Sequence, residues 1–295
     1  MLLYIKLARS LIIPLNVSKR MFCAVKNITP ISLAYNKIDG DPSLAPVIIA
    51  HGLFGNKTNW ATIAKNLNEN TKRTTIAVDL RNHGDSEHSS EHTYPHMAED
   101  LRFTLTQLNL NKYSLLGHSM GGRTVMLLAL MYPELIEKLV VADISPVTVS
   151  PQLRSIDKIF KAMEKVEFPK KVTRAACRRM VIEQLGRYID SEDLKAFLAT
   201  NITPMADGYS WAINVAALKE NYEEIAGFPK IDNQFHGPTL FIAGDLSDFI
   251  PLDEHDGIYK IFPNASITYI NDAGHWLHAD NPKEFVRVTT EFLNS

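Results

Sequence analysis

One serine stands in a sequence setting that is typical of a catalytic nucleophile. Residues 117–121 read GHSMG, which places Ser119 at the centre of a G-x-S-x-G motif. An apolar run that predicts a strand ends directly before the motif, and a helical pattern over 124–132 follows it. A strand-to-helix turn of this kind needs small residues around the serine and presents its hydroxyl at the positive end of the helix. The pattern therefore predicts that Ser119 is the nucleophile of a hydrolase.

A serine hydroxyl needs a neighbouring base to act as a nucleophile near neutral pH. His275 is the best candidate, because it follows the last predicted strand and lies late in the chain, as the order serine, acid, histidine requires. His278, three residues later, is a second candidate, and His118 is expected to support the nucleophile by packing. Solvated side chains rather than a metal site are expected in the polar stretch with His88, His92 and His96.

The loop after the first buried strand carries two glycines. Residues 51–55 read HGLFG and follow the apolar run 47–50. Glycine lets the backbone come close to a substrate. A main-chain N–H of this loop, together with that of Met120 after the serine, can bind the oxyanion of a tetrahedral intermediate. We predict Leu53 as the loop donor, with Phe54 as its rival.

Short apolar runs alternate with helical patterns over residues 30–147 and 231–295. This alternation predicts an α/β fold with a mostly parallel sheet and helices on both faces. Residues 148–230 break the alternation and predict a helical cap inserted over one end of the sheet. The predicted strands cover 47–50, 76–78, 113–116, 139–142, 239–243 and 267–270, and the predicted cap helices cover 151–166, 173–185, 191–200 and 209–225.

The composition is that of a globular protein, with 295 residues of which 45% are hydrophobic and 22% charged. Its formal net charge of -2 lacks the strong basic excess of a nucleic-acid-binding protein. Two cysteines, Cys23 and Cys177, provide neither a disulfide framework nor a cysteine-based zinc site. The expected serine chemistry requires no metal and no organic cofactor.

The N-terminal segment differs from the rest of the chain in its charge. No acidic residue precedes Asp39, whereas several basic residues do. Lys6 and Arg9 interrupt the apolar stretch 2–15, which is therefore too short and too charged to span a bilayer. A secretory signal would carry its charge ahead of an unbroken apolar run. Residues 1–21 therefore predict a mitochondrial transit peptide.

Four motifs in one order give the chain a specific resemblance. Besides GHSMG and HGLFG, residues 79–86 read DLRNHGDS and residues 273–276 read AGHW. Together they resemble the α/β-hydrolase superfamily over about residues 30–295. The residues within these motifs are similar to those of the alpha/beta-hydrolase domain-containing protein 11 branch and its bacterial esterase relatives. The loop 79–86 is expected to brace the site through structural hydrogen bonds.

The resemblance implies a serine hydrolase that cleaves acyl esters, an esterase or lipase with diacylglycerol-type substrates. For animal members it also implies the mitochondrial matrix and protection of a lipoylated dehydrogenase complex. Two alternatives stay open. An acyl thioesterase would use the same residues, and a hydrolase-fold binding protein would shield a mitochondrial partner complex without catalysis.

The residues alone do not identify the acid that would orient His275. In many α/β-hydrolases it lies three residues after a glycine at the end of the penultimate strand, and that position holds Ser247. Asp245 and Asp248 flank this serine without the usual spacing. Asp143 follows the strand next after the nucleophile, where an acid can reach the same histidine. The branch that the chain resembles is expected to use that geometry, so we predict Asp143 as the acid and Asp245 as the alternative.

The predicted cap carries an excess of positive charge. Between Arg154 and Arg187 the sequence has ten basic residues and four acidic ones, whereas the chain without residues 1–21 has a net charge of -6. Three of the basic residues recur at helical spacing and share one face: Lys158, Lys161 and Lys165. This pattern predicts a basic cap face that contacts an anionic membrane surface or an acidic acyl donor. A solvated helix face without a partner is the alternative.

Overall fold

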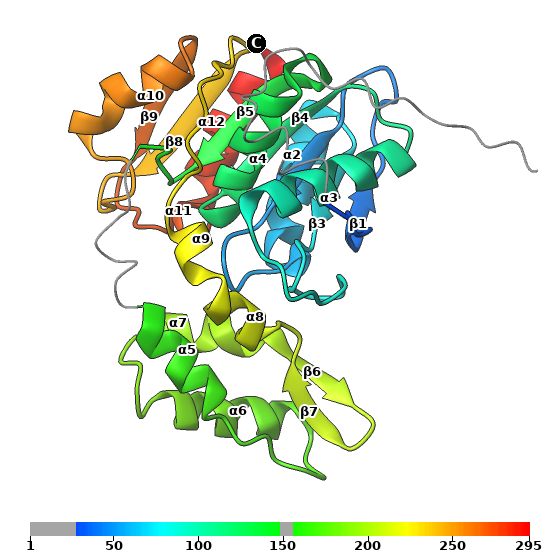
Figure 1. The fold of residues 1–295 in the computed structure, drawn as a ribbon, viewed down its shortest axis with the longest axis vertical. Coiled ribbons are helices and arrows are strands. Elements are labelled where there is room, and N and C mark those ends of the chain that lie inside the picture. The colour runs from blue at the N-terminus through cyan, green and yellow to red at the C-terminus, as the bar shows by residue number, and fades with distance from the viewer. Residues whose placement is uncertain (1–27, 148–155) are drawn as a thin grey trace, which may run out of the picture.

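The structure is a computed structural model that describes residues 28–147 and 156–295. Seven strands form one sheet in the order β1-β3-β2-β4-β5-β8-β9, and β1 alone runs antiparallel to its neighbour (Figure 1). The strands are β1 (Tyr35–Ile38), β2 (Val47–Ala50), β3 (Thr75–Val78), β4 (Tyr113–His118), β5 (Ile136–Ala142), β8 (Thr239–Gly244) and β9 (Ala265–Ile270). The predicted α/β fold with a mostly parallel sheet is confirmed, and the predicted transit peptide lies outside the described residues.

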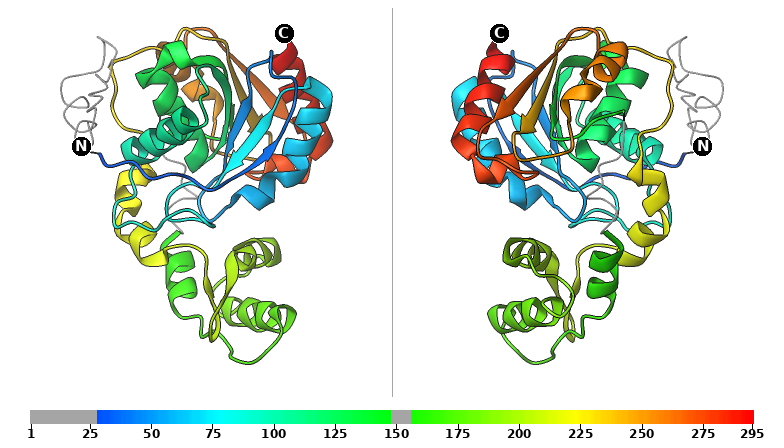
Figure 2. Two further views of the ribbon diagram at one scale, coloured as in Figure 1. Left: turned by 90° about the vertical axis from the view of Figure 1, so that its right-hand side faces the viewer. Right: turned by 90° about the vertical axis from the view of Figure 1, so that its left-hand side faces the viewer.

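Alternate residues of the central strands enter two separate hydrophobic cores. In β2, Ile48 packs with α3 (Tyr94–Gln107) and α4 (Met120–Met131) on one face of the sheet. Its neighbour Ile49 packs with α2 (Ala61–Thr71) and α12 (Pro282–Asn294) on the other face, as Figure 2 shows. A strand buried on both faces needs an unbroken apolar run, and VIIA in β2 is such a run.

The sheet register aligns three of the loops that carry the predicted site. Ala50 at the end of β2 lies opposite Gly117 in β4, and His118 lies opposite Ala142 at the end of β5. Because these strands are parallel, the chain leaves all of them at the same edge. The HGLFG loop, Ser119 and Asp143 therefore come side by side, although they are far apart in sequence.

Residues 156–226 form a layer of their own below this edge of the sheet (Figures 1 and 2). Its elements are α5 (Ile156–Glu164), α6 (Arg174–Leu185), α7 (Glu192–Leu198), β6 (Ile202–Met205), β7 (Gly208–Trp211), α8 (Val215–Glu220) and α9 (Tyr222–Ala226). We call this layer the cap. It has a hydrophobic core that includes Phe160, Val181 and Leu198. No helix of the described ranges, in cap or core, is long and apolar enough to cross a membrane.

The cap differs from the helical prediction in its second half. A β-hairpin of β6 and β7 occupies residues 202–211, where the expected helix over 209–225 would begin. The hairpin turns at Ala206 and Asp207, and Gly208 follows with a φ of 117°, a conformation that a residue with a side chain rarely adopts. An Asp-Gly pair is a known turn signal, although here Asp207 is the second loop residue and Gly208 is the first residue of β7.

Candidate active site

Ser119 lies on a sharp turn between β4 and α4. Its φ of 52° and ψ of -119° are strained for a residue with a side chain. The turn fits only because its neighbours are glycines. A Cβ on Gly117 would lie 2.4 Å from the Gly121 carbonyl oxygen, and one on Gly121 would lie 2.3 Å from the Ala50 carbonyl oxygen. The G-x-S-x-G spacing is therefore a steric requirement of bringing the helix back against the sheet.

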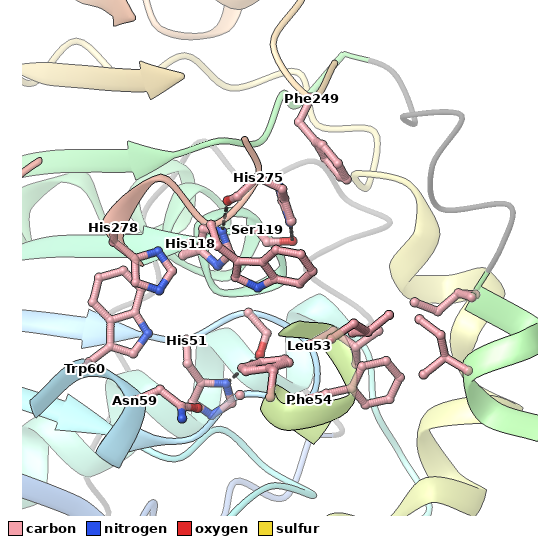
Figure 3. A pocket seen from close by; sticks show the side chains of 17 residues that line it. His51, Leu53, Phe54, Asn59, Trp60, His118, Ser119, Phe249, His275 and His278 are labelled. Carbon is pink, nitrogen blue, oxygen red and sulfur yellow. Dashed lines mark hydrogen bonds between the residues drawn. The ribbon is translucent and has the colours of Figure 1, made fainter. Parts of the chain in front are cut away.

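Three side chains from different strand ends form one continuous hydrogen-bonded path. His275 Nε2 lies 3.0 Å from Ser119 Oγ (Figure 3). On its other side, His275 Nδ1 lies 2.8 Å from Asp143 Oδ2. The Asp143 side chain is fully buried, and its other oxygen accepts the Gly244 N–H at 3.0 Å. The Ser247 hydroxyl donates to the same Oδ2 that faces the histidine. A carboxylate held by these donors fixes one tautomer of His275, with the proton on Nδ1 and a free lone pair toward Ser119.

The other candidates for acid and base lie away from this path. Asp245 is exposed, and its Oδ1 accepts the Ala273 N–H at 3.2 Å. Asp248 is half-buried. The His278 ring stacks on Trp60 with 4.2 Å between ring centroids, and it is His275 that lies within hydrogen-bond distance of Ser119. Ser247, at the position where the usual spacing after a glycine would place the acid, donates to Asp143 instead.

The hydrogen bonds of the HGLFG turn distinguish Leu53 from Phe54 as a possible oxyanion donor. The Phe54 N–H donates to His83 Nε2 at 3.3 Å, and the Gly55 N–H donates to the Gly52 carbonyl at 2.9 Å. Within the described ranges the N–H groups of Leu53 and Met120 have no acceptor. Met120 is also the first residue of α4, where the helix dipole favours negative charge. This arrangement leaves Leu53 and Met120 as the pair available to an oxyanion.

The imidazole of His275 is held from two sides. The Phe249 ring stacks on it with 3.8 Å between ring centroids, and His118 donates its Nε2–H to the His275 carbonyl at 2.7 Å. Burial lowers the pKa of His118 well below its usual value, so this ring stays neutral beside His275. The packing role expected for His118 thus includes a hydrogen bond to the backbone of the histidine loop. Sequence reasoning gave no role to Phe249.

The loop 79–86 contacts the HGLFG turn rather than the serine. The buried Asp79 carboxylate accepts the Lys57 N–H at 2.6 Å, just after the turn, and His83 accepts the Phe54 N–H. His92, expected to be solvated, is fully buried, and burial lowers its pKa to about 3. No group of His, Cys, Asp and Glu side chains in the described part of the chain is arranged to hold a metal ion.

A pocket of about 290 Å³ opens above Ser119 between the cap and the sheet (Figure 3). The cap contributes aliphatic and aromatic side chains to its wall: Ile156, Ile159, Leu194 and Phe197. The core contributes Leu53, Phe54, Trp60, Phe249 and Trp276. Phe197 of the cap and Trp276 of the core lie 5.9 Å apart between ring centroids, which joins the two walls on one side. The pocket can hold an apolar chain whose polar end reaches the serine.

The fold and the site together are those of an α/β-hydrolase. The family model described as alpha/beta hydrolase fold matches residues 45–282, and the chain belongs to this family. It is 40% identical to the mouse protein named sn-1-specific diacylglycerol lipase ABHD11, over 90% of this chain and 87% of the mouse protein. It is 35% identical to the Escherichia coli protein named Esterase YbfF, over 85% and 93% of the two chains.

A solved structure titled Marine microorganism esterase is also similar to this chain. The two are 38% identical and superpose with a TM-score of 0.82, over 89% of this chain and 99% of the other. Relatives that carry esterase or lipase names thus cover nearly the whole described chain. The predictions of an α/β-hydrolase and of an ester hydrolase are confirmed.

Proposed function

We propose that this ester hydrolase acts through Ser119, His275 and Asp143 and cleaves lipid-type acyl esters. The continuous hydrogen-bonded path from the Ser119 hydroxyl to the buried Asp143 carboxylate carries the proposal. The path ends at the base of an apolar pocket, so the hydroxyl faces the place where an acyl chain would lie.

Each group has a defined step in the proposed reaction. Ser119 Oγ attacks the acyl carbonyl carbon while His275 Nε2 takes its proton. The N–H groups of Leu53 and Met120 bind the oxyanion that forms. His275 then gives the proton to the leaving alcohol, and a water molecule repeats the sequence to release the acid and free the serine. Asp143 keeps the imidazole in the required tautomer and stabilises its positive charge.

The pocket and the relatives support a lipid ester as substrate. The wall is apolar apart from the polar groups next to the serine. Vertebrate relatives from mouse and zebrafish, each 40% identical, carry the name sn-1-specific diacylglycerol lipase. We therefore extend a diacylglycerol-type substrate to this chain. A thioester would meet the same groups, so the two acyl donors have to be compared directly.

An active-site probe tests the proposal. A fluorophosphonate should label the wild-type protein and the Ser43→Ala control, whose serine is exposed and remote, but not the Ser119→Ala variant. Turnover should then be measured on esters of graded chain length, on diacylglycerol and on an acyl thioester of matched length. If the wild-type protein is labelled and cleaves the thioester but none of the esters, the protein is a thioesterase. No labelling of the wild-type protein would favour a binding protein that shields a partner.

We further propose that the cap contacts an anionic membrane surface. Its α5 buries Phe160 and Met163 and exposes Lys158 and Lys161 on the opposite side. The ammonium group of Lys165 lies 5.4 Å from the centroid of the Tyr188 ring. Tyr188 is 43% exposed, and it supplies apolar surface next to the cations. A lipid substrate would then be taken from the surface to which the cap binds.

Vesicle co-sedimentation of the inactive Ser119→Ala protein tests this contact. Each cation near an anionic surface adds about 1 kcal/mol, so changing Lys158, Lys161 and Lys165 together to Gln should weaken binding about a hundredfold. A matched triple change on exposed lysines of the core should have little effect: Lys65, Lys72 and Lys283. Binding that is equal on neutral vesicles, or equal for both triple variants, would contradict the proposed contact.

We also propose that the chain works in the mitochondrial matrix. The acid-free, basic N-terminal segment over 1–21 supports this location. Cells expressing the full chain and a chain without residues 1–21 should be fractionated and treated with protease. Protease-protected protein in mitochondria is expected for the full chain and not for the shortened one.

A further inference from the structure

One side chain of the cap reaches the turn that carries the proposed oxyanion donor. Asn201 follows α7 and is 1% exposed. Its Nδ2 donates to the Phe54 carbonyl at 2.7 Å and, more weakly, to the Leu198 carbonyl at 3.3 Å. Its backbone carbonyl accepts the N–H of Ala212, which directly follows the hairpin, at 2.7 Å. A residue anchored in the cap thus bonds to the backbone of the core, 147 positions away in sequence.

The turn that receives this hydrogen bond is strained. Residues 52–55 form a four-residue turn closed by the hydrogen bond from Gly55 N–H to the Gly52 carbonyl. Phe54 is its third residue and has a φ of 62°, a conformation that favours glycine at that position. Strained residues of this kind persist only where their surroundings hold them.

Phe54 is held at three points. Its N–H donates to His83 in the core, and its carbonyl accepts from Asn201 in the cap. Its ring lies 5.4 Å from that of Phe160 between centroids and belongs to the hydrophobic core of the cap. Two of these three contacts of Phe54 therefore come from the cap.

We propose that Asn201 is a positioning residue for the oxyanion hole. By holding the Phe54 carbonyl it fixes the turn, and the turn fixes the direction of the Leu53 N–H toward the site above Ser119. The cap would then assist the chemical step as well as bind the substrate. This inference rests on the proposed function. Loss of one oxyanion donor lowers kcat about 100- to 1000-fold, and a donor that is misdirected rather than removed should cost less.

A second asparagine of the cap supplies a matched control. Asn221, between α8 and α9, donates its Nδ2 to the Ser90 carbonyl at 2.8 Å and accepts the His92 N–H at 3.3 Å. It also joins the cap to the core, but away from the turn 52–55. Changing asparagine to aspartate removes the amide donor at either position and keeps the size of the side chain.

The test compares Asn201→Asp with Asn221→Asp in the full protein. We expect Asn201→Asp to lower kcat on a short-chain ester about 10- to 100-fold with KM within about threefold, because an oxyanion forms only after substrate binding. Amide hydrogen exchange in a peptide covering residues 52–57 should become faster. Asn221→Asp should change neither quantity. Asn201→Ala, which buries no charge, is the second variant if Asn201→Asp does not fold.

Two results would overturn the inference. One is folded Asn201 variants with unchanged kcat and unchanged exchange in residues 52–57. The other is an equal loss of kcat in the Asn221→Asp control, which would make the effect a general consequence of loosening the cap. Wild-type turnover by Ser119→Ala would instead refute the proposed function, and the exchange measurement would still decide whether Asn201 holds the turn.

Discussion

Replacing Asp143 by asparagine removes one charge from the site and keeps the size of the side chain. The carboxylate accepts hydrogen bonds from His275, Gly244 and Ser247 and has no access to solvent. An asparagine has a single acceptor oxygen, so its NH2 group must face at least one of these donors. If it faces His275, the imidazole has to carry its proton on Nε2, and it can no longer accept the proton of Ser119. If it faces Gly244, one N–H is left buried without an acceptor.

The expected loss is large. The same change in a Ser-His-Asp triad lowers kcat about 10⁴-fold, which is about 5 kcal/mol of transition-state stabilisation. Asp245→Asn is the matched control, because its side chain is exposed and an amide oxygen still accepts the Ala273 N–H. That variant should stay within about twofold of the wild type. Both should be compared by kcat/KM on a short-chain nitrophenyl ester, with circular dichroism to establish folding. A greater loss in Asp245→Asn, or a loss below about tenfold in Asp143→Asn, would refute the assignment of the acid.

Three further changes test other parts of the structure. Ser247→Ala removes a hydrogen bond to the Asp143 carboxylate, of a kind worth about 1.5–3 kcal/mol, and should lower kcat about tenfold in the same ester assay. His278→Phe should reduce acid sensitivity. Burial lowers the pKa of His278 from 6.5 to about 3. Between these two pH values His278 binds a proton in the unfolded chain but not in the folded protein, so the folded protein loses stability as the pH falls. As the pH falls, the free energy of unfolding should therefore decrease less steeply in the variant than in the wild type, by up to about 1.4 kcal/mol per pH unit. Urea midpoints at several pH values measure this slope, and an equal slope in both proteins would argue against a neutral buried ring. Gly121→Ala should prevent folding, since its Cβ would lie 2.3 Å from a carbonyl oxygen of β2. Gly186→Ala in the cap is the control and should be tolerated. The yield of soluble protein and the thermal melt of each variant measure the difference.

The sequence predicted those parts of the site that depend on neighbouring residues. The elbow around Ser119 is recognisable because its small residues are adjacent in the chain. The position of His275 after the last strand is likewise a local pattern. The choice between Asp143 and Asp245 could not be made locally, since it depends on which of the two carboxylates the fold turns toward His275. The choice between Leu53 and Phe54 depends on His83, which comes from another loop.

The parts that were missed involve contacts across the cap boundary. The spacing of the cap residues predicted helices but not the hairpin over 202–211, whose strands are only four residues long. Nothing around Asn201 in the sequence distinguishes it from a surface asparagine. Its side chain donates to the Phe54 and Leu198 carbonyls and accepts from Asn56 Nδ2 at 3.5 Å, and Phe54 and Asn56 are distant in sequence. His92 was expected in solvent because its neighbours are polar. It is buried because the loop folds under Asn221 of the cap.

The location of Asp143 shows why chain order alone does not identify an acid of this kind. Strands β5 and β8 are neighbours in the sheet, with Ala142 opposite Ile242, so the residues that follow them leave the sheet side by side. The Asp143 N–H donates to the Ile242 carbonyl at 2.8 Å, which holds the end of β5 against β8. An acid after either strand can therefore reach the same histidine. In this chain, as we propose, β5 supplies the carboxylate. The last residue of β8 and the loop after it supply the donors that orient it, the Gly244 N–H and the Ser247 hydroxyl. What His275 requires is a carboxylate at one point in space, and the order of strands in the sheet decides which segment can provide it.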